Sequence, residues 1–226
     1  MKTESILKKI AKEYGNTPFE ASHLYGELND QESIDAFYQS LSRLVSNKQL
    51  IRLGKGTYCK PKISIFGLVP PDAKDIMSPY IENDKGMVIG YELFNALHLT
   101  TQVPKRIFAY SSALEGKAKT IGDVHLEKVD LTFSPEVKRH VQAMEVLNNI
   151  GWIEDFNENA FSAYIKEFVY SYSQSVMDKV LKSIRYKKAT IALLKEILDS
   201  CQTANDLSKY LNPLTKYKTP NLEGVL

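Results

Sequence analysis

Residues 34–60 read IDAFYQSLSRLVSNKQLIRLGKGTYCK, and this stretch decides the fold of the N-terminal part of the chain. Apolar residues recur at spacings of three and four from Ile34 to Val45, which predicts an amphipathic helix. Residues 50–53 and 57–60 are β-prone runs on either side of Gly54-Lys55-Gly56. Such runs around a glycine-rich tip predict two strands joined by a tight turn.

Two shorter helical segments precede this stretch. Ile6, Leu7, Ile10 and Tyr14 recur at helical spacing, and a second segment runs through Leu24 to its end at Gly26. Three helices followed by a hairpin with a basic tip are typical of a winged helix-turn-helix domain, which we expect over residues 1–62. Three aromatic residues are expected to pack in its core: Phe37, Tyr38 and Tyr58.

Charge is distributed unevenly along a chain that is nearly neutral as a whole. The 226 residues include 29 Lys+Arg and 27 Asp+Glu, for a formal net charge of +2. Residues 36–71 contain no Asp or Glu, yet they hold Arg43, Lys48, Arg52, Lys55, Lys60 and Lys62. An acid-free basic stretch on a small domain is typical of a surface that contacts phosphate, although a solvated basic face has the same composition.

The predicted recognition helix and hairpin supply the candidate DNA contacts. Exposed Gln, Ser, Arg and Asn on a helix in the major groove can read base edges or hold phosphates. Glycines on both sides of Lys55 let the hairpin tip approach a sugar-phosphate strand closely. The predicted DNA-binding residues are Gln39, Ser40, Arg43, Asn47, Lys48, Arg52, Lys55 and Lys60.

The rest of the chain is predicted to be a small mixed α/β region followed by a helical part. Short strand candidates alternate with helices up to residue 131, and Pro135 can begin a helix. From Phe161 to Ile184 a wide apolar stripe predicts one long helix of about six turns, buried in a core or a subunit contact. A basic cluster follows this stripe: Lys182, Arg185, Lys187 and Lys188. It fits a solvated helix junction, and it also fits a second patch for phosphate or a protein partner.

Several short motifs resemble AbiEi-type antitoxins of bacterial type IV toxin–antitoxin systems. These motifs are Leu41-Ser42-Arg43-Leu44, Gly54-Lys55-Gly56-Thr57-Tyr58, Phe66-Gly67 with Pro70, Gly90, Phe94-Asn95 and Leu99-Thr100-Thr101-Gln102-Val103-Pro104. The resemblance covers about residues 1–110, and His98 departs from it because the subgroup usually has glycine there. It implies an antitoxin that represses its own promoter through the winged helix. It also implies a C-terminal domain that opposes a nucleotidyltransferase-like toxin encoded beside it.

No catalytic or metal-binding motif is found in the sequence. The four histidines have no ligand-spaced partner, and Gly54-Lys55-Gly56-Thr57 lacks the upstream glycine and following helix of a phosphate-binding loop. Asp123, Glu127 and Asp130 are the only nearby carboxylates that a metal-dependent nuclease could use, and solvated turns explain them better. We therefore expect no enzyme, no cofactor and no metal.

The sequence also bears on the compartment. No apolar run approaches the roughly 20 residues that span a bilayer, and the N-terminus lacks the apolar block of a signal peptide. Cys59 and Cys201 form no CxxC pair, which favours reduced thiols in a cytoplasm.

Together these observations predict an α+β protein with three parts: a winged helix-turn-helix at 1–62, an α+β antitoxin domain with a helical end at 63–214, and a loose tail at 215–226. The residue patterns predict sequence-specific DNA binding, and the resemblance implies an autorepressor that is also a type IV antitoxin. The resemblance implies two partners, inverted repeats in the protein's own promoter DNA and the neighbouring-gene toxin as a functional partner, and no membrane is expected. The alternative is a protein-interaction module whose winged fold does not bind DNA.

Overall fold

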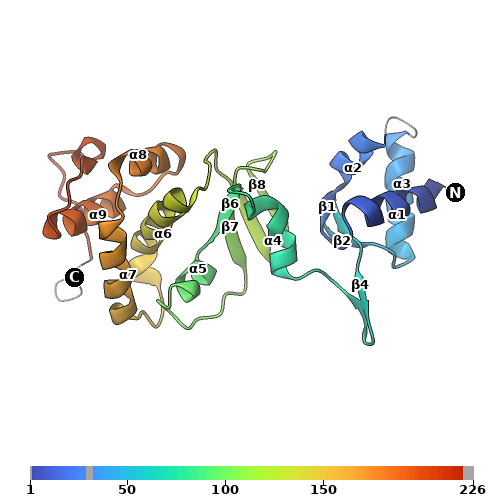
Figure 1. Cartoon of the computed structure of the whole chain (residues 1–226), viewed down its shortest axis with the longest axis horizontal. Helices are drawn as coiled ribbons and strands as arrows, with labels where there is room; N and C mark the ends of the chain where they lie inside the picture. Colours follow the sequence, from blue (N-terminus) through green and yellow to red (C-terminus); the bar gives the residue numbers. More distant parts are fainter. Residues whose placement is uncertain (1, 29–32, 221–226) are drawn as a thin grey trace. The chain divides into compact units, whose positions relative to one another are not determined.

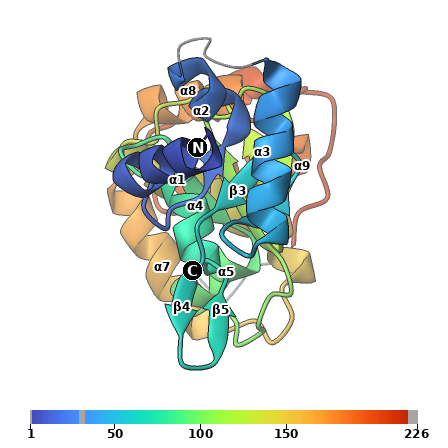
Figure 2. The same ribbon diagram turned by 90° about the vertical axis from the view of Figure 1, so that its right-hand side faces the viewer.

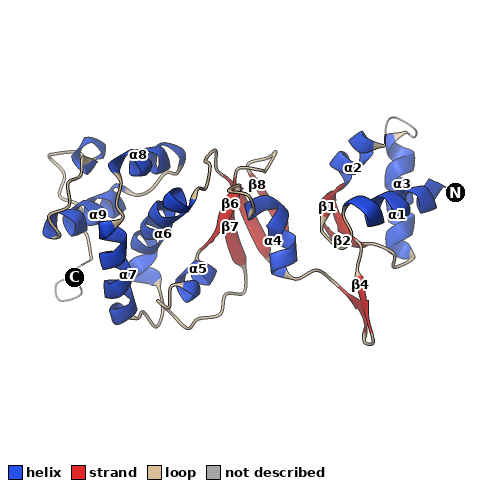
Figure 3. Ribbon diagram, in the orientation of Figure 1, coloured by secondary structure: helices blue, strands red, loops and turns tan. Residues whose placement is uncertain are grey.

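The chain divides into two compact units in a computed structural model, which describes residues 2–28 and 33–220. Unit 1 comprises Met1–Pro79 and Lys119–His125, and unit 2 comprises Tyr80–Ala118 and Leu126–Leu226. Helices and small sheets both occur along the chain, as Figure 3 shows, so the predicted α+β class is confirmed. The expected domain boundary after Lys62 falls inside unit 1.

Unit 1 begins with three helices and a three-stranded antiparallel sheet (Figure 1). The elements are α1 (Lys2–Glu13), β1 (Phe19–Glu20), α2 (Ala21–Glu27), α3 (Ile34–Ser46), β2 (Ile51–Gly54) and β3 (Thr57–Cys59). The sheet order is β1-β3-β2. Phe37 and Leu41 of α3 pack with Ile10 of α1 in the core of this unit, and all three are fully buried.

A second hairpin, which the sequence pattern does not predict, follows the sheet. β4 (Lys62–Ser64) pairs with β5 (Gly67–Val69), and α4 (Ala73–Ile81) comes next. The hairpin forms a narrow ribbon that extends away from α1, α2 and α3 (Figure 2). Lys62 at its base forms an ion pair with Asp75 of α4, at 3.0 Å.

The sheet of four strands comes from the middle of the chain. β6 (Gly86–Ile89), β7 (Ile107–Ser111), β8 (Ala118–Ile121) and β9 (Val124–Lys128) are arranged in the order β6-β7-β9-β8. The short helix α5 (Tyr91–Ala96) lies between β6 and β7 in the chain. Short strands and a helix therefore alternate in this region, as the sequence predicts.

Helices alone form the C-terminal part of unit 2. They are α6 (Pro135–Asn149), the 3-10 helix η1 (Ile150–Trp152), α7 (Glu158–Tyr170), α8 (Gln174–Ser183), α9 (Lys188–Ser200) and the 3-10 helix η2 (Leu207–Tyr210). Ser134 caps α6 by accepting a hydrogen bond from the Val137 N–H, and Pro135 occupies the first turn. Among the described helices, none is both long enough and apolar enough to cross a membrane.

The prediction of a single long helix from Phe161 to Ile184 is wrong. The chain is not helical at residues 171–173, which separate α7 from α8. The Ser173 N–H donates a hydrogen bond of 2.9 Å to Nε2 of His140 on α6 instead of continuing the helical ladder. The apolar stripe itself is buried as predicted, since Phe161, Val176 and Val180 all lie in the core. A tertiary contact from α6 therefore accompanies the break, and the local pattern of apolar residues does not reveal it.

Candidate nucleic-acid interface

Helix α3 exposes a polar face along most of its length. Phe37, Leu41 and Leu44 are fully buried and fix which side of the helix turns outward. Gln39 and Arg43 are exposed and four residues apart, so they lie on the same face of the helix. The Ser33 side chain caps the N-terminus by accepting a hydrogen bond from the Ala36 N–H, at 3.3 Å. This face can present hydrogen-bond donors and acceptors to a ligand that extends along the helix.

Ser40 does not belong to this face, because its residue is only 6% exposed. It lies three residues after Phe37 and four before Leu44, and helical geometry places residues at those spacings on one side. The sequence-based inclusion of Ser40 among the exposed residues is therefore corrected.

Two further residues of α3 belong to the exposed face and were not predicted. Tyr38, expected in the core, is 40% exposed, and Ser42 is exposed four residues later. Their spacing of four, out of phase with Phe37 and Leu41, is the signal that a helical projection of the sequence would have used. Tyr38 still contacts Phe37 edge-on, with ring centroids 5.5 Å apart, so its ring is held at the margin of the core.

The turn between β2 and β3 presents Lys55 to solvent. Gly56 adopts φ +73°, a left-handed conformation that glycine allows without steric cost. The Ala21 N–H donates to the Gly56 carbonyl at 2.8 Å, and Nε of Arg52 donates to the Gly54 carbonyl at 3.3 Å. These contacts anchor both sides of the turn, so Lys55 is displayed on a fixed support.

Lys48 and Lys60 lie at the other end of the same hairpin. Ile51 pairs with Cys59 there, whereas Lys55 occupies the turn. Both lysines line a groove of about 290 Å³, and no carboxylate lies among its described lining residues, which also include Leu7, Gln49, Pro61, Ile63 and Leu68. The structure thus divides the predicted cations of the hairpin into a tip group and a groove group.

Backbone geometry at the end of α3 depends on Lys48. Asn47 is the C-cap of the helix, and Lys48 follows it with φ +59°. The Gln49 and Leu50 N–H groups both donate to the Leu44 carbonyl, which closes the helix end. Glycine is the usual residue in this left-handed position, so a lysine here is unfavourable for the backbone.

Two acidic residues of unit 1, Glu20 and Asp35, come before the acid-free stretch in the sequence. Glu20 of β1 forms an ion pair with Lys119, at 2.5 Å. Asp35 lies in the first turn of α3, where the helix dipole favours a carboxylate. Residues 36–60 themselves contain no Asp or Glu, so the surface that they expose carries cations without intervening acidic residues of its own.

The predicted basic cluster of unit 2 is not one patch with a common environment. Lys188 donates a hydrogen bond of 2.6 Å to the Tyr210 carbonyl, and Lys187 is the N-cap of α9. Lys182 instead lines a cleft with Lys128 and Lys179. Arg185 is exposed between α8 and α9.

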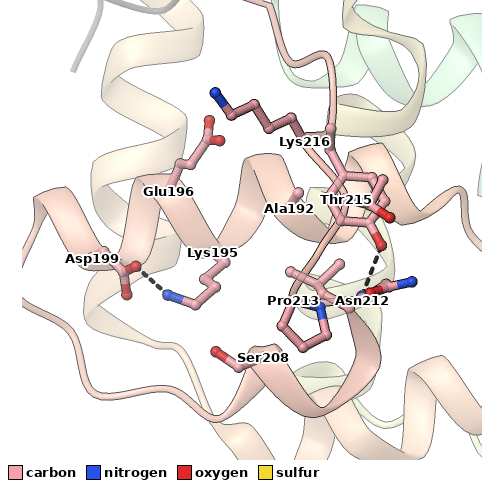
Figure 4. A pocket seen from close by; sticks show the side chains of 11 residues that line it. Ala192, Lys195, Glu196, Asp199, Ser208, Asn212, Pro213, Thr215 and Lys216 are labelled. Carbon is pink, nitrogen blue, oxygen red and sulfur yellow. Dashed lines mark hydrogen bonds and ion pairs between the residues drawn. The ribbon is translucent and has the colours of Figure 1, made fainter.

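A pocket of about 540 Å³ lies between α9 and the segment that follows η2 (Figure 4). Lys195 forms an ion pair with Asp199, and Glu196 and Lys216 also line the pocket, so its charges balance. The Asn212 N–H donates to the Tyr217 hydroxyl at 2.8 Å. The beginning of the expected loose tail therefore packs against α9, while residues 221–226 lie outside the described part of the chain.

The cysteines do not form a disulfide, since Cys59 and Cys201 are both free. Burial raises the pKa of the Cys59 thiol to about 11, so this thiol is protonated at neutral pH. Within residues 2–28 and 33–220, no group of three or more His, Cys, Asp or Glu is arranged to hold a metal ion. These described residues therefore include no metal-binding group formed by Asp123, Glu127 and Asp130.

Among solved structures, the chain is similar to the crystal structure of the RV2827C protein from Mycobacterium tuberculosis. It is 11% identical, with a TM-score of 0.47, and the match covers 90% of this chain and 78% of that chain. No curated protein matches the chain. Residues 8–150 match a family profile described as "Family of unknown function (DUF6088)". Because this match spans more than half of the sequence, the chain belongs to the DUF6088 family.

Proposed function

We propose that the protein is a sequence-specific DNA-binding repressor of its own promoter, and that unit 1 contains a winged helix-turn-helix. The observation that carries the proposal is the combination of element order, α1-β1-α2-α3-β2-β3, with an exposed polar face on α3 and a displayed lysine at the β2–β3 turn. A helix of this size fits the major groove of B-DNA, and a hairpin turn can follow the neighbouring backbone.

In this proposal the residues of α3 and the hairpin have different tasks. Gln39 and Arg43 read base edges, because an amide and a guanidinium can each form paired hydrogen bonds with one base. Lys55 and Arg52 contact phosphates at the hairpin, and Asn47, Lys48 and Lys60 contact phosphates beyond the end of α3. Phosphate contacts position the domain, and base contacts select the sequence.

We further propose that the protein is the antitoxin of a type IV toxin–antitoxin pair, as its resemblance to AbiEi-type antitoxins implies. Unit 2 would oppose a nucleotidyltransferase-like toxin encoded by the neighbouring gene. Both activities are binding activities that need no catalysis or cofactor, and both belong to a bacterial cytoplasm.

Two experiments test the two halves of this proposal. Gel shifts with the upstream intergenic DNA should show a preference for an inverted repeat that weakens as salt increases. Binding without sequence preference would contradict the repressor half. Co-expression with the neighbouring gene should rescue a growth arrest that this gene causes alone, and failure to rescue would contradict the antitoxin half.

A protein-interaction module without DNA binding is the second candidate, and the β4–β5 ribbon favours it. Ile63, Ile65 and Phe66 of this ribbon are 85%, 93% and 93% exposed, which is unusual for a soluble monomer. A nuclease-treated pull-down from native lysate distinguishes the candidates. A protein partner lost in Phe66→Ala, together with an absence of DNA binding, would favour the module. DNA binding that is unchanged in Phe66→Ala would favour the repressor.

A further inference from the structure

A cleft in unit 2 lies between the segment that follows β9 and helix α8. Its volume is about 820 Å³, within the range of pockets that hold small molecules. One side is formed by residues around the end of β9 and the start of α6, and the other by the last turns of α8. The lining residues are Lys128, Val129, Asp130, Leu131, Thr132, Ser134, Val137, Lys179, Lys182 and Ser183.

Three lysines from distant parts of the chain converge on this cleft. Lys179 and Lys182 are three residues apart on α8 and therefore share a face, and Lys128 comes from the end of β9. Among the described residues, Asp130 is the only carboxylate that lines the cleft, and it lies 3.9 Å from Lys128 with its side chain 90% exposed. Three ammonium groups against one solvated carboxylate give the lining a formal charge of +2.

Contacts among the described residues match the positive charge of the cleft only in part, since Asp130 pairs with Lys128. The ammonium groups of Lys179 and Lys182 form no ion pair with any described residue. A lysine in the last turn of a helix is favoured by the helix dipole, which accounts for Lys182. The dipole does not account for Lys179, one turn earlier, or for Lys128 on a strand.

The remaining lining residues combine hydroxyl groups with an apolar wall. Thr132 is exposed, and the Ser183 hydroxyl donates to the Asp130 carbonyl at 3.0 Å, which holds the two sides of the cleft together. Val129 and Val137 are only 7% and 6% exposed, and Leu131 packs against the hydrophobic core of unit 2 to which both valines belong. A ligand in this cleft meets cations, hydroxyl groups and an apolar surface at once.

We propose that this cleft binds a nucleoside di- or triphosphate. The phosphates contact Lys128, Lys179 and Lys182, because two or three linked phosphates carry enough negative charge to match three ammonium groups. The base or sugar lies against Val129, Leu131 and Val137. This site shares no residue with the proposed DNA contacts of unit 1, so it does not rest on the proposed function.

Isothermal titration of the full chain with ATP, pyrophosphate and adenosine tests this site. ATP should bind most tightly, pyrophosphate more weakly because it lacks the base, and adenosine weakest of the three. Lys179→Ala combined with Lys182→Ala should weaken ATP binding at least tenfold. No binding of ATP, or binding of adenosine as tight as that of ATP, would overturn the proposal.

Arg185→Ala combined with Lys187→Ala is the matched control, since it removes the same charge from exposed residues that do not line the cleft. This control should bind ATP within about twofold of the wild type. An equal loss in both double variants would show a general effect of charge and overturn the site. The phosphates of a nucleic-acid strand are the other possible ligand, and a short single-stranded oligonucleotide tests for them. If the oligonucleotide displaces ATP at a lower concentration than free nucleotide does, and if this displacement depends on Lys179 and Lys182, the assignment to a mononucleotide is overturned.

Discussion

Adjacent residues of α3 have opposite environments, and this difference separates the residues that we propose to read DNA from those that hold the fold. Gln39 is exposed and Ser40 is buried, because each step along a helix turns the side chain by about 100°. Tyr38 and Ser42 extend the exposed face beside Gln39 and Arg43. The chemistry of a candidate DNA contact is therefore decided residue by residue, not by the composition of the helix.

We expect Gln39→Ala and Arg43→Ala to relax sequence specificity. Each lost paired contact with a base should reduce discrimination against the wrong base by about 1–3 kcal/mol. Competition binding with operators that carry single base substitutions measures this loss. Ser40→Ala is the control, because its buried side chain cannot reach a base, and it should leave discrimination unchanged. Relaxed specificity in Ser40→Ala would contradict the assignment of the exposed face.

At Lys48, the proposed role in DNA binding and a role in stability predict different effects of substitution. Its left-handed backbone costs a non-glycine residue about 1–2 kcal/mol, and glycine loses about 0.5–1 kcal/mol in chain entropy instead. Lys48→Gly should therefore raise the free energy of unfolding in urea by about 0–1.5 kcal/mol, while it weakens DNA binding. Lys48→Arg keeps the charge and should keep the affinity. Destabilisation by Lys48→Gly, with unchanged affinity, would assign the lysine a structural role.

Helices and strands were predictable from the sequence wherever the local pattern was strong. The apolar spacing of α3 and the glycines at the β2–β3 turn placed these elements correctly. The β4–β5 ribbon was not predicted, because its exposed apolar residues have no core-facing alternation. The break between α7 and α8 coincides with a hydrogen bond to His140, a contact between segments 33 residues apart. Of the predicted DNA contacts, Ser40 is wrongly assigned to the exposed face. Its polarity alone suggests exposure, but its position in the helix places it on the buried side.

Helix α6 carries a buried carboxylate whose protonation affects stability. Oε1 of Glu145 accepts hydrogen bonds from the Tyr110 and Tyr186 hydroxyls, at 3.0 and 2.9 Å. Burial raises the pKa of Glu145 above its usual value, and the two hydroxyls only partly oppose this effect. The folded state therefore binds a proton more readily than the unfolded state does.

We accordingly expect the contribution of Glu145 to the free energy of unfolding to be largest below pH 4.5. This contribution should decrease as the pH rises through the raised pKa of the folded state. Glu145→Gln keeps an acceptor for both hydroxyls and removes the titration, so urea unfolding of this variant should lose that part of the pH dependence. Glu196→Gln on α9, an exposed residue, is the control and should follow the wild type. An identical pH profile in Glu145→Gln would contradict the shifted pKa.

At the scale of the whole molecule, the described residues form two hydrophobic cores, one in each unit. Unit 1 is not continuous in sequence, because residues 119–125 join it and Lys119 pairs with Glu20. A side chain on Gly54 would lie 3.1 Å from the Thr120 carbonyl oxygen, so β2 and this returning segment approach closely. Such an insertion from the middle of the chain leaves no local signal, which is why a boundary after residue 62 was the natural expectation.

The salt dependence of binding to the upstream intergenic DNA tests most directly whether unit 1 holds DNA through α3 and the β2–β3 turn. Log affinity should fall linearly with log salt concentration, and Lys55→Ala should reduce this slope by about 0.9, as the loss of one phosphate contact requires. Lys55→Ala should also weaken binding to all sequences alike. A slope that is the same in Lys55→Ala and the wild type, or no salt-dependent binding by the wild type, would contradict DNA binding through this surface.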